Sequence, residues 1–208
     1  MTRCTAAWCP TTSTASSPTT RTGKVQELSL NILDIAQNSI KAGATLVRIE
    51  IEIDRAKNGM RIAVIDNGCG MDEATLERVV DPFYTTRTTR KVGLGVPFFK
   101  MASEMAGGQF SIRSAPGEGT AVEATFQWDN VDRMPLGDMA ATYCSLVMVS
   151  EGTDFVYTHT VDGRSFTADS REFRAVLEGV PLSTPDVQAF IRDYIRENTE
   201  EISGGAYE

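Results

Sequence analysis

The segment Leu46 to Asp54 alternates strictly between apolar and polar residues, and this feature constrains the fold more than any other. The apolar positions are Val47, Ile49, Ile51 and Ile53, and the polar positions are Arg48, Glu50, Glu52 and Asp54. Successive side chains of a β-strand point to opposite faces of a sheet. The pattern therefore predicts a strand that is covered on one face and open to solvent on the other.

The neighbouring segments predict further helices and strands. Apolar residues recur at helical spacing over 26–42, and Gly43 then predicts a helix end. An Asn58-Gly59 turn leads into a second strand, which ends at Asp66. The remaining expected elements are a short helix at 72–80 capped by Asp72, a polar loop at 81–95, a helix from Pro97 to about 106, and strands at 109–114 and 120–127.

This order of elements predicts an α+β fold, a two-layer sandwich in which helices cover one face of a mixed sheet. We expect four parts: a disordered Thr/Ser/Ala/Pro-rich tail at 1–24, the sandwich domain at 25–128, a small α+β C-terminal region at 129–200, and a frayed tail at 201–208. In the C-terminal region the pattern predicts helices at 136–149, 171–178 and 184–199, with strands at 155–160 and 165–169.

Composition excludes several classes of partner. The net charge of −8 disfavours nucleic acid. A content of 41% hydrophobic and 23% charged residues is typical of a soluble globular protein. No apolar stretch is long enough to cross a membrane or to act as a secretory signal, so we predict a cytoplasmic protein. Four cysteines without a CxxC pair, and one histidine, disfavour a structural zinc site.

Two local patterns could form a binding site. Four polar residues recur at i, i+3, i+7 and i+10 on one face of the first predicted helix: Asn31, Asp34, Asn38 and Lys41. From this spacing alone, a solvated helix face is the favoured interpretation. Asp66 ends the second strand and is followed by Gly68 and Gly70, which would let the backbone approach a flat ligand closely. Taken alone, such a segment is more often an ordinary turn than a binding site.

Together, five segments resemble the sequence boxes of Bergerat-type ATP-binding domains, the module of gyrase, heat-shock chaperone, histidine-kinase and MutL ATPases. The segments are 34–45, 65–71, 81–87, 93–96 and 117–120. The first is most similar to the N box of the MutL branch, and 81–87 and 93–96 are similar to boxes of histidine kinases. The resemblance covers half of the chain and implies the Bergerat fold with bound ATP and Mg²⁺.

The resemblance also implies roles for individual residues. Asp66 is expected to accept a hydrogen bond from the adenine amino group, with Thr120 supporting it through an ordered water. Such an acceptor favours ATP over GTP, because guanine presents a carbonyl oxygen at that position. Asn38 is expected to hold Mg²⁺ through its side-chain oxygen. The remaining candidate cofactor-binding residues are Lys41, Gly68, Gly70, Gly93, Leu94 and Gly95, with Arg87, Arg90 and Lys91 as candidate lid cations.

Two residues limit the expected chemistry. Asp34 occupies the position of the general base, which is Glu in ATP-hydrolysing relatives such as MutL, so hydrolysis is expected to be slow. The only histidine, His159, falls in a predicted strand. The phosphoacceptor histidines of kinases lie instead on a long helix in a recognisable acidic context, which is absent around His159. We therefore interpret His159 as a structural residue.

Three functions remain under consideration. The first is a stand-alone regulatory protein that binds or phosphorylates a protein partner. The alternative is an ATP-driven conformational ATPase that dimerises on nucleotide binding, as suggested by the MutL-like N box. A sensor-kinase fragment is less favoured, because sensor, membrane and phosphoacceptor segments are not recognised. The chain also resembles small stand-alone ATP-binding proteins of anaerobic bacteria, which implies a partner linked to anaerobic redox or hydrogenase systems.

Overall fold

The computed structural model describes residues 27–80 and 95–205. Within them, six strands form one sheet in the order β3-β4-β2-β1-β5-β6. The strands are β1 (Leu46–Asp54), β2 (Gly59–Asp66), β3 (Phe110–Ala115), β4 (Gly119–Gln127), β5 (Asp154–Val161) and β6 (Arg164–Asp169). The helices are α1 (Leu28–Lys41), α2 (Glu73–Val79), α3 (Gly95–Met105), α4 (Met139–Val149), α5 (Ser170–Val176) and α6 (Pro185–Ser203). None of these helices is long and apolar enough to span a bilayer.

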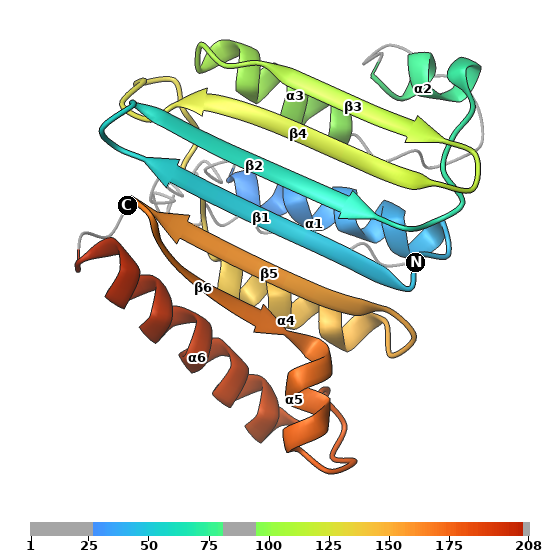
Figure 1. Cartoon of the computed structure of the whole chain (residues 1–208), viewed down its shortest axis with the longest axis vertical. Helices are drawn as coiled ribbons and strands as arrows, with labels where there is room; N and C mark the ends of the chain where they lie inside the picture. Colours follow the sequence, from blue (N-terminus) through green and yellow to red (C-terminus); the bar gives the residue numbers. More distant parts are fainter. Residues whose placement is uncertain (1–26, 81–94, 206–208) are drawn as a thin grey trace, which may run out of the picture.

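The sheet is mixed, with β1 at its centre. β1 pairs antiparallel with β2, so that Val47 lies opposite Asp66, and parallel with β5, so that Ile51 lies opposite His159. The other neighbouring pairs are antiparallel. Figure 1 shows α1, α3 and α4 behind the sheet and α6 along its β6 edge. The predicted α+β sandwich with a mixed sheet is confirmed.

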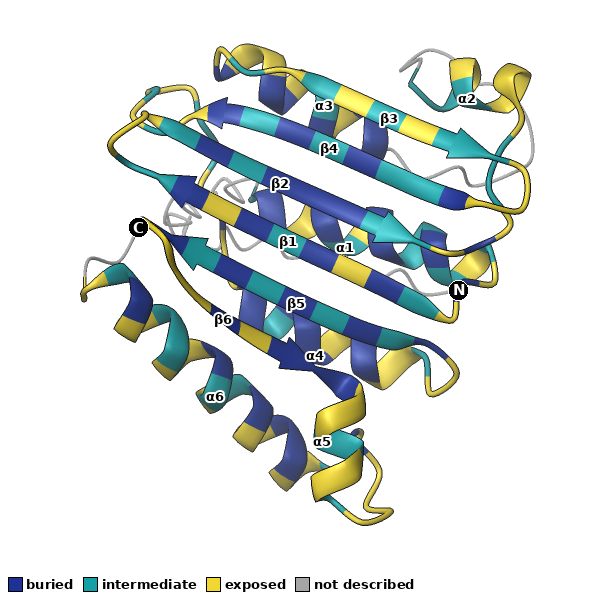
Figure 2. Cartoon of the chain, viewed as in Figure 1, coloured by how far each residue is buried: buried dark blue, intermediate teal, exposed yellow. Residues whose placement is uncertain are grey.

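The two faces of the sheet differ as the alternating pattern predicts (Figure 2). Val47, Ile49, Ile51 and Ile53 are each at most 2% exposed and pack against the helices. The opposite face is polar: Arg61 on β2 forms ion pairs with Glu50 on β1 and Glu123 on β4. The core therefore lies between the sheet and one layer of helices.

The two ends of α1 have different causes. The helix ends before Gly43, whose φ of +75° is a left-handed conformation that glycine adopts readily, as predicted. Its beginning has no side-chain cap. Instead, the backbone N–H groups of Leu28 and Ser29 donate to the carbonyls of Pro135 and Leu136. The segment after β4 thus satisfies donors that helix starts otherwise leave unpaired.

The remaining helix boundaries differ modestly from the predictions. α2 begins after Asp72, whose carboxylate accepts from the backbone of Thr75, as predicted. These hydrogen bonds from Thr75 lower the pKa of Asp72 below its ordinary value. α4 starts later than expected, because Gly137 has φ +83° and Asp138 caps the helix. α6 continues beyond the predicted end to Ser203, since no helix-breaking residue occurs before Gly204.

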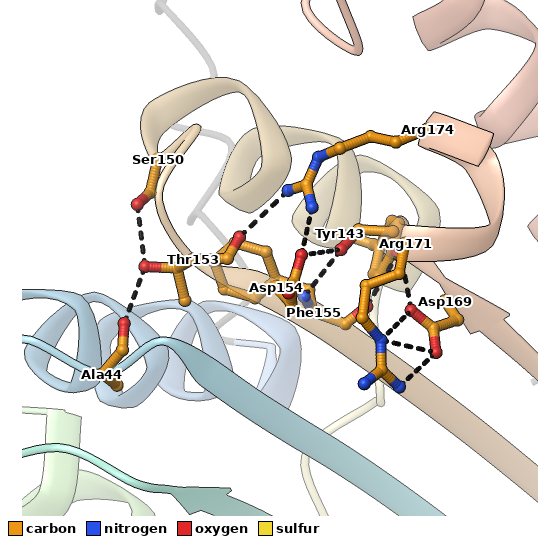
Figure 3. A network of polar contacts seen from close by, with 10 residues as sticks. Ala44, Tyr143, Ser150, Thr153, Asp154, Phe155, Asp169, Arg171 and Arg174 are labelled. Atoms are coloured by element: carbon orange, nitrogen blue, oxygen red, sulfur yellow. Dashed lines mark hydrogen bonds and ion pairs between the residues drawn. The ribbon is translucent and has the colours of Figure 1, made fainter. Parts of the chain in front are cut away.

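A polar network joins the C-terminal strands to the end of α1 (Figure 3). The Thr153 hydroxyl donates to the carbonyl of Ala44 at 2.9 Å, and Ser150 donates to Thr153. Arg174 on α5 pairs with Asp154 and donates to the Thr153 carbonyl. β5 also pairs with β1, and β6 with β5, so both strands continue the sheet of the preceding segment, a pairing that the sequence pattern did not predict.

Candidate functional site

A cavity of about 250 Å³ lies between α1, the end of β2, and β4. Its polar lining comes from segments that are distant in sequence: Asn38 and Ser39 on α1, Asp66 on β2, and Thr120 on β4. Gly70 lines it as well. The apolar lining consists of Ile35, Ala42, Met71, Val79, Val96, Ile112 and Val122. The fold thus places four of the predicted cofactor-binding residues, Asn38, Asp66, Gly70 and Thr120, around one space.

Asp66 is held in one orientation by three hydrogen-bond donors. Its Oδ1 accepts from the backbone N–H of Gly68 at 2.9 Å and from that of Thr120 at 3.2 Å. Its Oδ2 accepts from the Ser39 hydroxyl at 2.5 Å. An ionised carboxylate offers about four acceptor positions. The donors among the described residues therefore leave one position open, in a direction set by the other three bonds.

Packing within the protein itself explains why glycine occurs at two positions after Asp66. Gly70 has φ +66°, and a Cβ atom there would lie 1.9 Å from the carbonyl oxygen of Ala115. A Cβ atom at Gly68 would lie 3.0 Å from the Ala42 side chain. These glycines allow the turn to approach the β3–β4 connection and the end of α1. Contact with neighbouring parts of the chain, and not only with a ligand, therefore requires glycine at both positions.

The Ser114 hydroxyl links two residues that line the cavity, Met71 and Thr120. Ser114 on β3 accepts from the backbone of Met71 at 2.8 Å, donates to the Gly119 carbonyl, and lies 3.0 Å from the Thr120 hydroxyl oxygen. Ser39 and Ser114 are not among the residues that the sequence pattern predicted for the site. Ser39 could have been found, because it is a polar residue next to Asn38 on the apolar side of the helix. Ser114 carries no comparable signal.

Asp34 lies against the beginning of α3. It is exposed, and a Cβ atom added to Gly95 would lie 2.6 Å from its Cβ. Only a glycine lets the start of α3 approach α1 so closely. The first backbone N–H groups of an α-helix lack partners within the helix. At the start of α3 they are therefore available to donate hydrogen bonds to a polar ligand beside Asp34.

The other members of the polar stripe on α1 lie in different surroundings. Lys41 is exposed in the last turn and does not line the cavity. Asn31 is 9% exposed, and its Nδ2 atom has no hydrogen-bond partner among the described residues. The stripe is therefore not a uniformly solvated face. Five predicted cofactor-binding residues lie outside the described residues: Arg87, Arg90, Lys91, Gly93 and Leu94.

Metal binding can be judged from the donors available. Within 27–80 and 95–205, no group of three or more His, Cys, Asp or Glu side chains is placed to hold a metal ion. Asn38 offers one amide oxygen beside the cavity. Mg²⁺ is commonly held by one or two protein oxygens together with substrate phosphates and waters. A nucleotide-bound Mg²⁺ fits this donor set, whereas an all-protein metal site does not.

Part of the chain is similar in sequence to sensor proteins. The chain is 36% identical over 107 residues to a putative sensor protein of Shewanella frigidimarina and 39% identical over 89 residues to the sensor protein kinase FleS of Pseudomonas aeruginosa. These alignments cover 50% and 43% of this chain but 16% and 22% of the relatives. The chain thus spans less than a quarter of the length of these relatives.

A solved structure also aligns with the chain. It is the Aquifex aeolicus MutL ATPase domain complexed with ADP, with a TM-score of 0.43 and 16% identity, over 88% of this chain and 71% of that one. A family model described as histidine kinase-, DNA gyrase B- and HSP90-like ATPase matches residues 23–130, which is more than half of the chain. The chain therefore belongs to the family of histidine kinase-, DNA gyrase B- and HSP90-like ATPases and is an ATP-binding protein of that type.

Proposed function

We propose that the chain binds Mg-ATP in the cavity beside Asp66 and acts, in a nucleotide-dependent way, on a protein partner. The observation that carries the nucleotide assignment is the carboxylate of Asp66. It lines the cavity with one acceptor position left over by the donors from Gly68, Thr120 and Ser39. Family membership supports the same ligand.

Asp66 would select the base. In this proposal its free acceptor position receives the amino group of adenine, and Thr120 supports the base through an ordered water. The apolar walls formed by Ile35 and Ile112 suit a flat ring. Guanine would present a carbonyl oxygen to a carboxylate already fixed in place, so ATP is preferred over GTP.

The triphosphate would extend along α1 toward α3. Asn38 would bind Mg²⁺, and Mg²⁺ would bridge phosphate oxygens. The start of α3 at Gly95 offers backbone donors and the positive end of a helix dipole. We include Gly93, Leu94, Lys41 and the cations Arg87, Arg90 and Lys91 as further phosphate contacts, on the family resemblance of their segments.

Asp34 would orient the attacking water. Its position against Gly95 puts a carboxylate at the start of α3, close to where the terminal phosphate would lie. The side chain is one methylene shorter than the Glu of hydrolysing relatives. Because phosphoryl transfer depends mainly on positioning, a displacement of about 1 Å can cost roughly 100-fold in rate. Slow intrinsic hydrolysis follows.

An exposed apolar stripe on α3 supports the proposal of a protein partner. Phe98, Met101 and Met105 lie at i, i+3 and i+7 of α3 and are 39%, 47% and 58% exposed. Large apolar side chains gathered on one helix face commonly mark a protein contact. The helix that carries them begins at the proposed phosphate site, so a nucleotide-dependent change at Gly95 would reach this face directly. The similarity to sensor kinases makes phosphotransfer the first activity to test.

The test follows the γ-phosphate of labelled ATP in three directions: to water, to the protein itself, and to a protein added from a cell extract. We expect slow release to water and transfer to a protein partner. Asp34→Ala should abolish both while leaving ATP affinity within about twofold, and Asp193→Ala, which removes an exposed carboxylate from α6, should change neither. Failure to bind ATP would overturn the whole proposal.

The alternative is an ATP-driven ATPase that closes into a dimer. Light scattering with a non-hydrolysable ATP analogue distinguishes the two functions. A nucleotide-dependent dimer with phosphate released only to water would replace the regulatory proposal by this one. A monomeric complex that transfers phosphate to a partner excludes the dimer mechanism.

A further inference from the structure

Ser114, Thr120 and Asp66 form one row across three strands, on the face of the sheet that the helices cover. Thr120 on β4 lies directly opposite Asp66 on β2 and directly opposite Ser114 on β3. These strands are neighbours toward the β3 edge of the sheet (Figure 1). Asp66 and Thr120 line the nucleotide cavity, and Ser114 is not among the described residues that do. Any effect of Ser114 on a ligand therefore passes through its neighbours.

The surroundings of Ser114 fix the direction of its hydroxyl proton. A hydroxyl group carries a single proton and two lone pairs. Ser114 Oγ lies 2.8 Å from the Gly119 carbonyl oxygen, which can only accept, so the proton points there. The backbone N–H of Met71, at 2.8 Å, occupies one lone pair. Toward Thr120, whose Oγ1 lies 3.0 Å away, Ser114 has only its second lone pair to offer.

The Thr120 hydroxyl therefore donates to Ser114. Were its proton turned elsewhere, lone pairs of the two hydroxyl oxygens would face each other at 3.0 Å. With this proton engaged, the Thr120 oxygen has only lone pairs left for a ligand in the cavity that the residue lines. The proton of Ser39 is engaged in the same way, by Asp66 Oδ2 at 2.5 Å. Asp66, Ser39 and Thr120 thus offer a ligand acceptors and no side-chain proton.

Two acceptors on opposed residues of neighbouring strands match one edge of a purine. Side chains directly opposite each other in an antiparallel pair lie about 5 Å apart, which is close to the spacing of two substituents on alternate ring atoms. In the proposed function, Asp66 binds the amino group of adenine. The next substituted ring atom along that edge is C2, which then lies toward Thr120. An amino group at C2 would meet an acceptor there, whereas an oxygen would meet lone pairs.

We propose that Ser114 is a positioning residue that sets base specificity, because it fixes Thr120 as a hydrogen-bond acceptor toward C2 of the bound purine. The site then takes purine nucleotides with a hydrogen atom or an amino group at C2, and it rejects those with an oxygen there. The inference rests on the proposed function, since it requires the base to lie against Asp66. It adds a second position of base selection to the one that Asp66 provides.

Two nucleotides that differ in the group at C2 test the proposal. Both 2-amino-ATP and 2-oxo-ATP keep the amino group that Asp66 would bind, but only the first presents a donor at C2. Calorimetric titration of the full-length chain should show 2-amino-ATP binding at least about tenfold more tightly, because the oxygen of 2-oxo-ATP would face the acceptor on Thr120. Equal affinities of the parent for these two nucleotides would overturn the proposal.

Ser114→Ala releases the Thr120 proton, which can then turn toward an oxygen at C2. The preference for 2-amino-ATP over 2-oxo-ATP should fall about fivefold, and Ser114→Thr, which keeps a hydroxyl group, should retain the preference of the parent. Ser111→Ala is the matched control, since Ser111 is an exposed serine of the same strand that lies opposite Glu123 on the other face. An unchanged preference in Ser114→Ala, or an equal fall in Ser111→Ala, would contradict the role of Ser114.

Thr120→Val gives an independent result should Ser114→Ala prove unstable in urea unfolding. It removes the hydroxyl that Ser114 orients, so the preference at C2 should fall by a similar factor, and adding Ser114→Ala should change it no further. A preference that survives Thr120→Val would overturn the proposal. Failure of the parent to bind ATP would instead overturn the proposed function. The two failures are therefore distinguished in the same set of titrations.

Discussion

One polar residue lies toward each end of the central strands, and the two residues differ in the hydrogen-bond partners that hold them. At one end, Asp66 is the last residue of β2 and accepts from Gly68, Thr120 and Ser39. At the other, His159 lies within β5, with one ring nitrogen beside Tyr157 and the other without a hydrogen-bond partner among the described residues. A strand end leaves backbone N–H groups available to orient a side chain. A residue within a strand has its backbone engaged in pairing, and must rely on side chains or a ligand.

The largest expected effect tests how tightly the Asp66 end is built. Gly70→Ala places a Cβ atom 1.9 Å from the Ala115 carbonyl oxygen at φ +66°. Gly117→Ala is the matched control, since its φ is +80° but nothing lies within 4 Å of the added carbon. Urea unfolding should show a loss of about 3 to 4 kcal/mol for the first and about 1 kcal/mol for the second. Equal losses would mean that only the backbone conformation matters.

The second effect concerns the His159 end. The pKa of His159 is about 4 in the folded chain against 6.5 for the free side chain, because burial disfavours the charged ring. Between these values the unfolded state binds more protons, so stability falls as the pH falls from 6.5 toward 4. The loss attributable to this group reaches about 3 kcal/mol. It is measured as the difference in pH dependence of unfolding between the parent and His159→Phe; parallel curves would contradict a neutral, buried ring.

The third effect tests recognition at the Asp66 end. Asp66→Asn replaces an acceptor by a group that also donates, and should weaken ATP binding by about 1 to 3 kcal/mol, roughly 5- to 150-fold. Asp72→Asn removes a nearby exposed carboxylate that caps α2 and should leave ATP affinity almost unchanged. Isothermal titration calorimetry gives both values. Normal ATP binding by the first variant would show that Asp66 does not read the base.

The smallest expected effect tests how far the nucleotide site depends on the C-terminal region. Thr153→Val removes the hydrogen bond from the Thr153 hydroxyl to the Ala44 carbonyl, which links the start of β5 to the end of α1. The buried carbonyl then loses a donor, at a cost of about 1 kcal/mol in unfolding free energy. ATP affinity should stay within about twofold, if the link is structural only. A larger change in ATP affinity would show that the C-terminal region influences the nucleotide site.

The local patterns predicted most of the elements. The alternation at 46–54, the Asn58-Gly59 turn and the helical spacing before Gly43 each produce the expected structure, because each depends on short-range backbone geometry and one-sided burial. Boundaries that depend on distant groups were less predictable. The start of α1, paired with Pro135 and Leu136, has no local signal at all.

Single residues of the candidate site also differ in whether a local pattern or a contact with a distant residue reveals them. The resemblance singled out Asn38, Asp66, Gly70 and Thr120, and the fold brings these four around one cavity. Ser39 and Ser114, which hold Asp66 and Thr120 in place, were missed. Hydroxyl groups of this kind occur throughout the sequence, so only their distance to a partner distinguishes them.

By itself, the sequence determined the sandwich, its open and covered faces, and the segments that carry the ATP-binding boxes. These features depend on periodicity and on residue types at fixed short spacing. The tertiary structure alone decided that β5 pairs with β1, that segment 128–137 caps α1, and that His159 is buried between α4, α6 and the end of β1. Contacts between segments so far apart leave no periodic trace, because packing selects them only after the elements have formed.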